Sequence, residues 1–167
     1  TQTNSYNTAV GYVAGNDITT GTLNTLIGAL AGDKLTNASS NTAVGYNAGL
    51  EVTTGTNNTL IGTESGDAVT TGDHNTVVGN EAMKATTSGA ANVAVGSLAL
   101  YDNTSGGNNV AIGMKALENN TTGSSNTSAG WKSMDTNTTG SDSVAIGRQA
   151  LFAQTTANNN TAVGNYA

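Results

Sequence analysis

The chain has 167 residues, no cysteine, no proline and a net charge of −6 at pH 7. This composition excludes disulfide and thiolate-metal staples and argues against nucleic-acid binding, which needs clustered Lys and Arg. No apolar run approaches the roughly 20 residues of a membrane span. Leu, Ile, Val and Phe contribute only 28 residues, yet only 10% of the chain is charged, so it lacks the high charge of a disordered protein.

A glycine recurs every 17 residues, ten times in all, without an insertion or deletion. A fixed short period is typical of a solenoid, in which each turn stacks on its neighbours. A phrase such as Asn7-Thr8-Ala9-Val10 precedes each glycine and predicts one short strand per turn. We therefore predict an all-β fold, a parallel β-solenoid (β-roll) of ten 17-residue coils, forming a single uncapped domain over residues 1–167 within a longer chain. The repeat glycines are Gly11, Gly28, Gly45, Gly62, Gly79, Gly96, Gly113, Gly130, Gly147 and Gly164.

Two strand positions are apolar in almost every repeat. The residue directly before the glycine is Val or Ile in nine of ten repeats, with Ala129 as the exception, and we expect it to be the main inward position. The residue two before the glycine is Ala, Leu or Val in nine repeats, with Ser128 as the exception. Because strand side chains alternate, it should point outward, against partner chains. The thin core of one chain and this second apolar face together predict a homotrimer.

After the glycine, two positions exchange one large apolar side chain. In the first four repeats the fourth position is Gly and the seventh is aliphatic, as in Gly49 and Val52. From the fifth repeat onward the fourth is Leu or Met and the seventh is polar, as in Leu117 and Asn120. Core volume must stay roughly constant, so both positions should fill one shared site. The exchange marks a change of repeat subtype near residue 79.

Two polar columns and the charged residues complete the pattern. Asn opens the strand phrase in nine of ten repeats, and Thr stands eight residues after the glycine from Thr19 to Thr155. Stacked in register, these side chains are expected to form hydrogen-bonded ladders. All sixteen charged residues lie one, two, five, six, eleven or twelve residues after the glycine, which predicts exposed corners there and buried positions elsewhere.

Four aromatic residues are candidate receptor or glycan contacts, because aromatic rings stack on sugars and are common at binding surfaces. They are Tyr12, Tyr46, Tyr101 and Trp131. The alternative is that these rings cover corners or seams of the trimer. Trp131 lies in the most unusual repeat, where small residues predict either a docking notch or a tryptophan folded over the gap.

No catalytic, cofactor or metal site is predicted. His74 follows Asp73, but no nucleophile recurs beside them, and Gly106-Gly107-Asn108-Asn109 does not continue as a calcium-binding repeat. We therefore expect a protein that is not an enzyme.

The segments Asn109 to Leu117 and Ser143 to Leu151 resemble the head repeat of trimeric autotransporter adhesins. The 17-residue form with a Thr121-Thr122-Gly123 turn is similar to repeats of bacteriophage tail fibres, which often lie upstream of an endosialidase-type intramolecular chaperone. The resemblance covers essentially the whole chain. It implies a left-handed parallel β-roll wound as a homotrimer, serving as the shaft or head of a surface fibre.

The expected function is that of a structural and receptor-binding segment of an extracellular phage tail fibre, which attaches the virion to a host cell. Its expected partners are two further copies of the chain, other fibre or tail proteins, and a host glycan or protein receptor. A bacterial trimeric adhesin head at the cell surface is the alternative. An ice-binding solenoid is a further one, although Thr19-Thr20 and Thr53-Thr54 are adjacent rather than spaced two apart.

Overall fold

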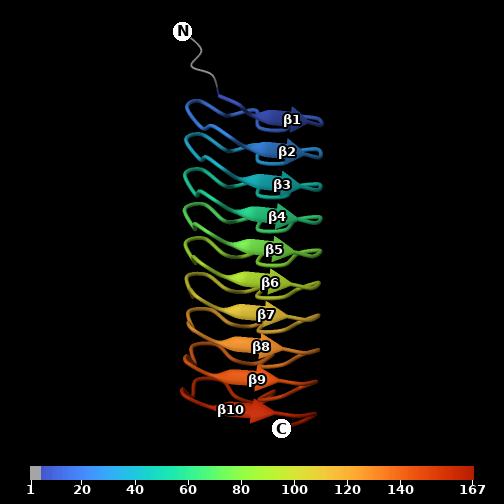
Figure 1. Cartoon of the computed structure of the whole chain (residues 1–167), viewed down its shortest axis with the longest axis vertical. Coiled ribbons are helices and arrows are strands. Elements are labelled where there is room, and N and C mark those ends of the chain that lie inside the picture. Colours follow the sequence, from blue (N-terminus) through green and yellow to red (C-terminus); the bar gives the residue numbers. More distant parts are fainter. Residues whose placement is uncertain (1–4) are drawn as a thin grey trace.

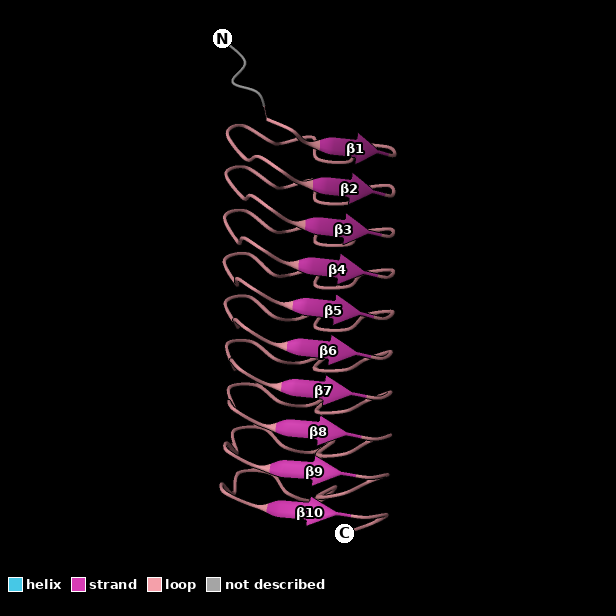
Figure 2. Ribbon diagram, in the orientation of Figure 1, coloured by secondary structure: helices cyan, strands magenta, loops and turns pink. Residues whose placement is uncertain are grey.

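The structure, a computed structural model, describes residues 5–167 as one column of stacked turns (Figure 1). Each turn contributes a single three-residue strand, and the described residues contain no helix (Figure 2). The ten strands are β1 (Thr8–Val10), β2 (Thr25–Ile27), β3 (Thr42–Val44), β4 (Thr59–Ile61), β5 (Thr76–Val78), β6 (Val93–Val95), β7 (Val110–Ile112), β8 (Thr127–Ala129), β9 (Val144–Ile146) and β10 (Thr161–Val163).

All ten strands form one parallel sheet in chain order, from β1 to β10. Thr8 pairs with Thr25 and Val10 with Ile27, and every later pair repeats this register. Backbone bonds continue between turns, for example from the Gly28 amide to the Val10 carbonyl at 2.8 Å. The predicted all-β parallel solenoid is confirmed, with ten strands and about nine complete turns between the first and the last.

The repeat glycine is required where each strand ends. Gly11 has a φ of 138°, a backbone conformation that L side chains rarely adopt. A Cβ atom at Gly11 would lie 2.3 Å from the carbonyl oxygen of Gly28 in the next turn, and one at Gly62 would lie 2.5 Å from that of Gly79. Stacked turns approach each other too closely here for any side chain, which explains why this position is glycine in all ten repeats.

The strand alternates in the opposite sense to the prediction. The residue two before the glycine is buried: Leu26, Leu60 and Val77 are 0% exposed. The residue directly before the glycine faces outward, and Ile27 is 41% exposed. The prediction assumed that the bulkier residue lies inside. The inward residue fills the space opposite the strand, since a Cβ atom at Gly15 would lie 2.7 Å from Leu26 Cδ1. This column varies in size with the residue opposite it: Leu60 lies opposite Gly49, and Ala94 opposite Met83.

The shared corner site is confirmed. Val52 and Leu117 are both 0% exposed although they occupy different repeat positions. A Cβ atom at Gly49 would lie 3.2 Å from Val52 Cγ2, so glycine at the fourth position makes room for the aliphatic side chain at the seventh. The third position, always Ala or Ser, is also buried within the stack, and Ala116 is one example. Core volume is thus conserved between the two repeat subtypes.

The predicted asparagine ladder runs along the interior edge of the sheet. Asn41 is 1% exposed, and its backbone amide donates to Asn24 Oδ1 at 2.9 Å. Its side-chain Nδ2 donates to the Gly55 carbonyl at 2.8 Å. The same bonds recur through Asn58, Asn75, Asn92, Asn109 and Asn126. Each amide replaces hydrogen bonds lost on burial, so the ladder holds the turns in register.

A threonine ladder follows the opposite corner, with a chemical detail that the sequence did not indicate. Each hydroxyl donates to the backbone carbonyl of the equivalent threonine in the next turn rather than to its hydroxyl. Thr36 Oγ1 donates to the Thr53 carbonyl at 3.0 Å, and Thr104 Oγ1 to the Thr121 carbonyl at 2.9 Å. These hydroxyls are therefore occupied by the chain itself.

Candidate functional surfaces

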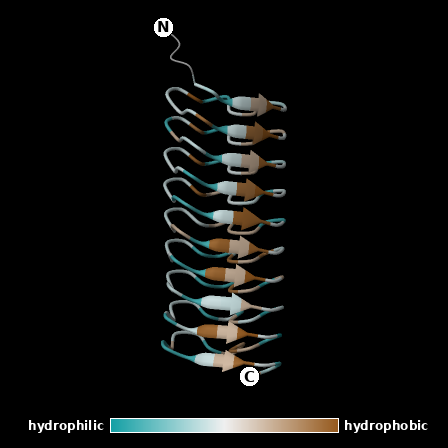
Figure 3. Cartoon of the chain, in the orientation of Figure 1, coloured by the Kyte–Doolittle hydropathy of each residue, from teal (hydrophilic) through white to brown (hydrophobic). Residues whose placement is uncertain are grey.

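The outward residues before the repeat glycines form a continuous apolar stripe along one face. We call it the Val/Ile stripe. Figure 3 shows the hydrophobic colour concentrated on the strands, with β8 pale between its neighbours. Individual side chains are 37% to 68% exposed where they are most open, as Val78 and Val163 show. The stripe comprises Val10, Ile27, Val44, Ile61, Val78, Val95, Ile112, Ile146 and Val163, interrupted by Ala129.

A second column shares this face. The residue three before the glycine points to the same side of the sheet as the stripe, because side chains alternate with a period of two. It is Thr from β1 to β5 and in β8 and β10, and Val in β6, β7 and β9. Neither column contains a charged residue. The outer face of the sheet is therefore two β-branched side chains wide in every strand except β8, where Ala129 takes the place of Val or Ile.

The charged corners are more closely paired and more buried than the sequence pattern predicted. Lys34 lies 3.0 Å from Asp33 and 3.4 Å from Asp17, and Lys115 lies 2.9 Å from Glu118. Lys84 pairs with Glu64 in the same way. The expectation that every charged position is exposed is wrong for some acids: Asp33 is only 5% exposed.

Two aspartates at the fifth position have perturbed acidities. Burial, reinforced by Glu64 and Glu51, raises the pKa of the Asp67 carboxyl above its usual value, and Lys84 opposes this. Burial and a hydrogen bond with Glu118 raise the pKa of Asp135. The Oδ1 atoms of Asp67 and Asp135 are both buried without a hydrogen-bond partner among residues 5–167. No group of three potential metal ligands accompanies them in that part of the chain.

The four predicted aromatic contacts do not form one site. Tyr12 and Tyr46 occupy the first position after their glycines, two turns apart, and are 77% and 50% exposed. Trp131 occupies the same position five turns after Tyr46 and is half-buried. Tyr101 stands at the fifth position and is also half-buried. The column of first positions thus carries three of the four rings, but widely separated along the rod.

A cluster around Trp131 combines aromatic and cationic side chains from successive turns. The Arg148 guanidinium lies 4.9 Å from the Trp131 ring centroid and 5.0 Å from that of Tyr166. The Lys132 ammonium lies 5.5 Å from Trp131 and 5.8 Å from Phe152. Of these residues only Trp131 was among the four predicted contacts. Aligning the first two positions of successive repeats would have placed Arg148, Lys132 and Tyr166 beside it.

In the unusual eighth turn the two small serines lie inside the stack. Ser128 and Ser133 are both 0% exposed, and their hydroxyls lie 2.5 Å apart. Ser128 Oγ also donates to the Ser133 carbonyl at 2.9 Å, while Met134 fills the neighbouring corner site. Two small polar residues therefore satisfy each other inside the turn.

Asp73, which precedes His74, bonds to the previous turn. Asp73 Oδ1 accepts hydrogen bonds from the Thr56 amide and hydroxyl, at 2.5 and 3.0 Å. The carboxylate therefore connects two turns rather than orienting the imidazole.

Residues 5–167 include no helix that could span a membrane. In comparisons with family models, curated proteins and solved structures, nothing matched this chain.

Proposed function

We propose that the chain is a structural segment of a homotrimeric phage tail fibre that takes part in attachment to a host cell. The observation that carries the proposal is the Val/Ile stripe, an apolar face that follows the sheet from β1 to β10. The repeat phrases that resemble tail-fibre repeats support the biological setting.

The size of the stripe supports burial against further copies. Seven of its ten residues are at least 37% exposed, so it is an extended apolar face rather than a set of scattered single residues. A stable interface buries about 800 Å² on each partner, and in a trimer the stripe and its neighbouring Thr/Val column would each contribute to one of the two interfaces of a chain.

The two outward columns favour three chains over two. In a parallel three-fold arrangement, each chain can present one column to each neighbour. Because every turn repeats the same residues at the same height, in-register copies would place β-branched side chains level with one another.

The hydrogen bonding of the threonines within the chain argues against an ice-binding role for them. Thr19 Oγ1 donates to the Thr36 carbonyl, and the neighbouring Thr20 Oγ1 donates to Asn37 Oδ1.

Oligomeric state tests the proposal directly. Light scattering of the chain at micromolar concentration should give three times the 16.5 kDa of one chain. Ile61→Lys combined with Ile112→Lys should produce monomers, because charges cannot be left in an apolar seam. Ser105→Lys combined with Thr122→Lys adds the same charge at exposed positions away from the stripe and should remain trimeric. A wild-type monomer, or a trimer that tolerates both stripe lysines, would refute the assembly.

Attachment needs a separate measurement. The fluorescently labelled trimer should bind the surface of a susceptible strain in a panel of bacteria, and excess unlabelled trimer should compete. Absence of binding across the panel, with trimer formation intact, would restrict the segment to a purely structural role.

A further inference from the structure

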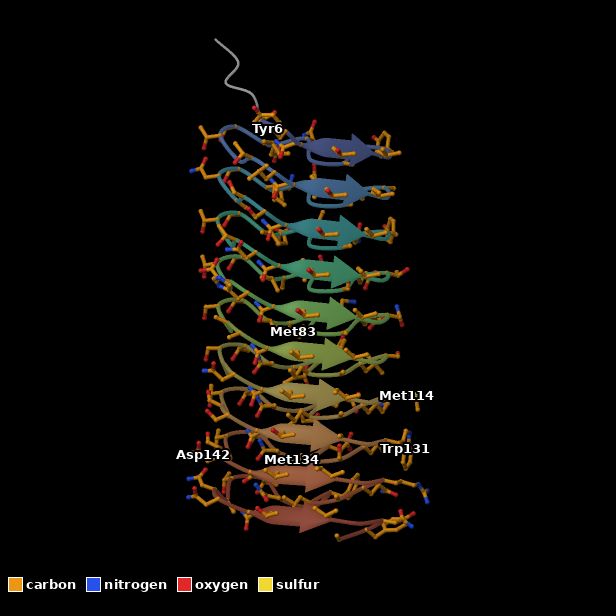
Figure 4. The ribbon with its side chains drawn as sticks, viewed as in Figure 1. Tyr6, Met83, Met114, Trp131, Met134 and Asp142 are labelled. Atoms are coloured by element: carbon orange, nitrogen blue, oxygen red, sulfur yellow. The ribbon has the colours of Figure 1, made fainter. Side chains whose placement is uncertain are left out.

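We propose that the corner formed by Trp131, Lys132, Arg148 and Tyr166 binds a carbohydrate that carries a carboxylate, such as a uronic or sialic acid. This inference deepens the attachment part of the proposed function, because it names a ligand class for one part of the rod. Trp131 lies at the outer edge of the column, beyond the strand ends and close to Met114 (Figure 4).

Arg148 is placed to bind an anion. It is exposed, and among residues 5–167 no carboxylate lies within ion-pair distance of it, whereas Lys34, Lys84, Lys115 and Lys132 each have an acidic partner. The Arg148 guanidinium lies within 5.0 Å of the Trp131 and Tyr166 ring centroids and carries N–H donors along its edges. Those edges match the two oxygens of a carboxylate.

Lys132 adds a second positive charge to the same corner. Its only ion pair within the described residues is a long one, 3.8 Å to Asp135. The Asp135 side chain is 8% exposed, so it lies beneath the surface rather than in the path of a ligand. At the first and second positions of the last three turns there is no acidic residue. The corner is therefore locally cationic on a chain whose net charge is −6.

The aromatic rings make a sugar the best match for the rest of the ligand. Arg148 lies within 5.0 Å of both ring centroids, so the two rings are no more than about 10 Å apart. The apolar face of a sugar ring can stack on an aromatic side chain of this corner while its acid group reaches Arg148. An acidic peptide would use the cations but not the flat ring surfaces.

Trp131 is the only tryptophan of the chain and reports binding at this corner. The trimer would be titrated with hexagalacturonate, with 3′-sialyllactose, and with the neutral sugars galactohexaose and lactose, following tryptophan emission and heat. At least one acidic sugar should bind and change the emission, and its neutral counterpart should bind at least about tenfold more weakly.

Two variants that remove one positive charge locate the site. Arg148→Gln should weaken binding of the acidic sugar by about tenfold or more. Lys34→Gln removes a cation at a corner several turns away and should leave binding unchanged. The inference would be overturned if neither acidic sugar bound, or if the neutral sugars bound equally well. It would also be overturned if both variants lost binding equally, or if oligoglutamate bound as tightly as the acidic sugar.

Light scattering of the same samples separates this inference from the proposed assembly. A trimer that binds no acidic sugar contradicts only the inference, and a monomer that binds one contradicts only the assembly.

Discussion

The turns before Gly79 and the turns after it build one backbone around different interiors. In the early turns the fourth position is glycine with a left-handed backbone, as at Gly32 with φ 57°, and the corner is filled by Leu35. In the later turns Leu117 has almost the same backbone, φ 53°, yet carries the large side chain itself. The later arrangement accepts about 1 kcal/mol or more of backbone strain per turn.

A second amide ladder accompanies the strained later turns. Asn120 Nδ2 donates to Asn103 Oδ1 and to the Gly123 carbonyl, both at 2.9 Å, and Asn137 Nδ2 donates to Asn120 Oδ1 at 2.9 Å. In the early turns the same column is aliphatic, with Leu35 and Val52 fully or almost fully buried. Stacking thus conserves the volume and the hydrogen bonding of a turn, but different residues can provide them in different turns.

Truncating the corner side chain tests whether the two halves depend on it equally. Leu117→Ala should lower the free energy of unfolding by about 2 to 4 kcal/mol through the cavity it leaves. Val52→Ala should cost less, about 1 to 3 kcal/mol, because fewer atoms are removed. Urea unfolding of both variants measures the difference. Negligible losses in both would mean that the corner is not a packed site.

Exchanging the two arrangements tests the shared volume itself. Gly49→Met should cost about 1 to 3 kcal/mol, because the new Cβ atom would lie 2.7 Å from Leu60 Cδ1. Adding Val52→Thr and Leu60→Ala reproduces the fifth turn, where Met83 and Thr86 precede Ala94.

The triple variant should recover most of the stability lost by Gly49→Met. Thermal unfolding of the single and triple variants provides the measurement. A triple variant less stable than the single one would show that the halves are not interchangeable.

The second amide ladder should matter only in the later turns. Asn120→Ala leaves buried donors and acceptors on Asn103, Asn137 and Gly123, at a cost of about 1 to 3 kcal/mol. Asn80→Ala is the matched control, since Asn80 is exposed and makes one long bond of 3.4 Å. Its unfolding free energy should stay within about 0.5 kcal/mol of wild type. Equal losses from the two changes would contradict a structural role for the ladder.

Asp67 and Asp135 should produce the smallest effect, which depends on pH. Burial raises the folded-state pKa of each above its ordinary 3.8, so the native state holds the proton more tightly than the unfolded state. The resulting stability is present below that value and is lost as pH rises through the folded-state pKa.

Asp67→Asn should therefore gain stability relative to wild type as pH rises from 3 to 7, by no more than about 1 kcal/mol because the group is partly solvated. Asp135→Asn should gain less, since it also loses the pair with Lys132. Urea unfolding at both pH values measures this, and a loss for Asp67→Asn at pH 7 would show the sign to be wrong.

Much of the fold could be predicted because each turn contacts its own copies. The 17-residue period determined the solenoid and its register. Stacking of one turn on the next also accounts for the invariant glycine, the Asn column and the exchange at residues such as Gly49 and Val52. Neighbours in space are neighbours in the repeat, so sequence comparison within the chain substitutes for coordinates.

Three features required the tertiary structure. The sequence cannot say which of two alternating apolar positions is inside, since Ala111 and Ile112 are both uncharged; the space left by the corner residues decides it. Burial of Asp33 depends on how tightly the corner folds over it. The Trp131 cluster depends on the reach of Arg148 between turns. The sequence by itself determined the stacking of identical positions, whereas only the tertiary structure decided how unlike positions share the interior and the surface.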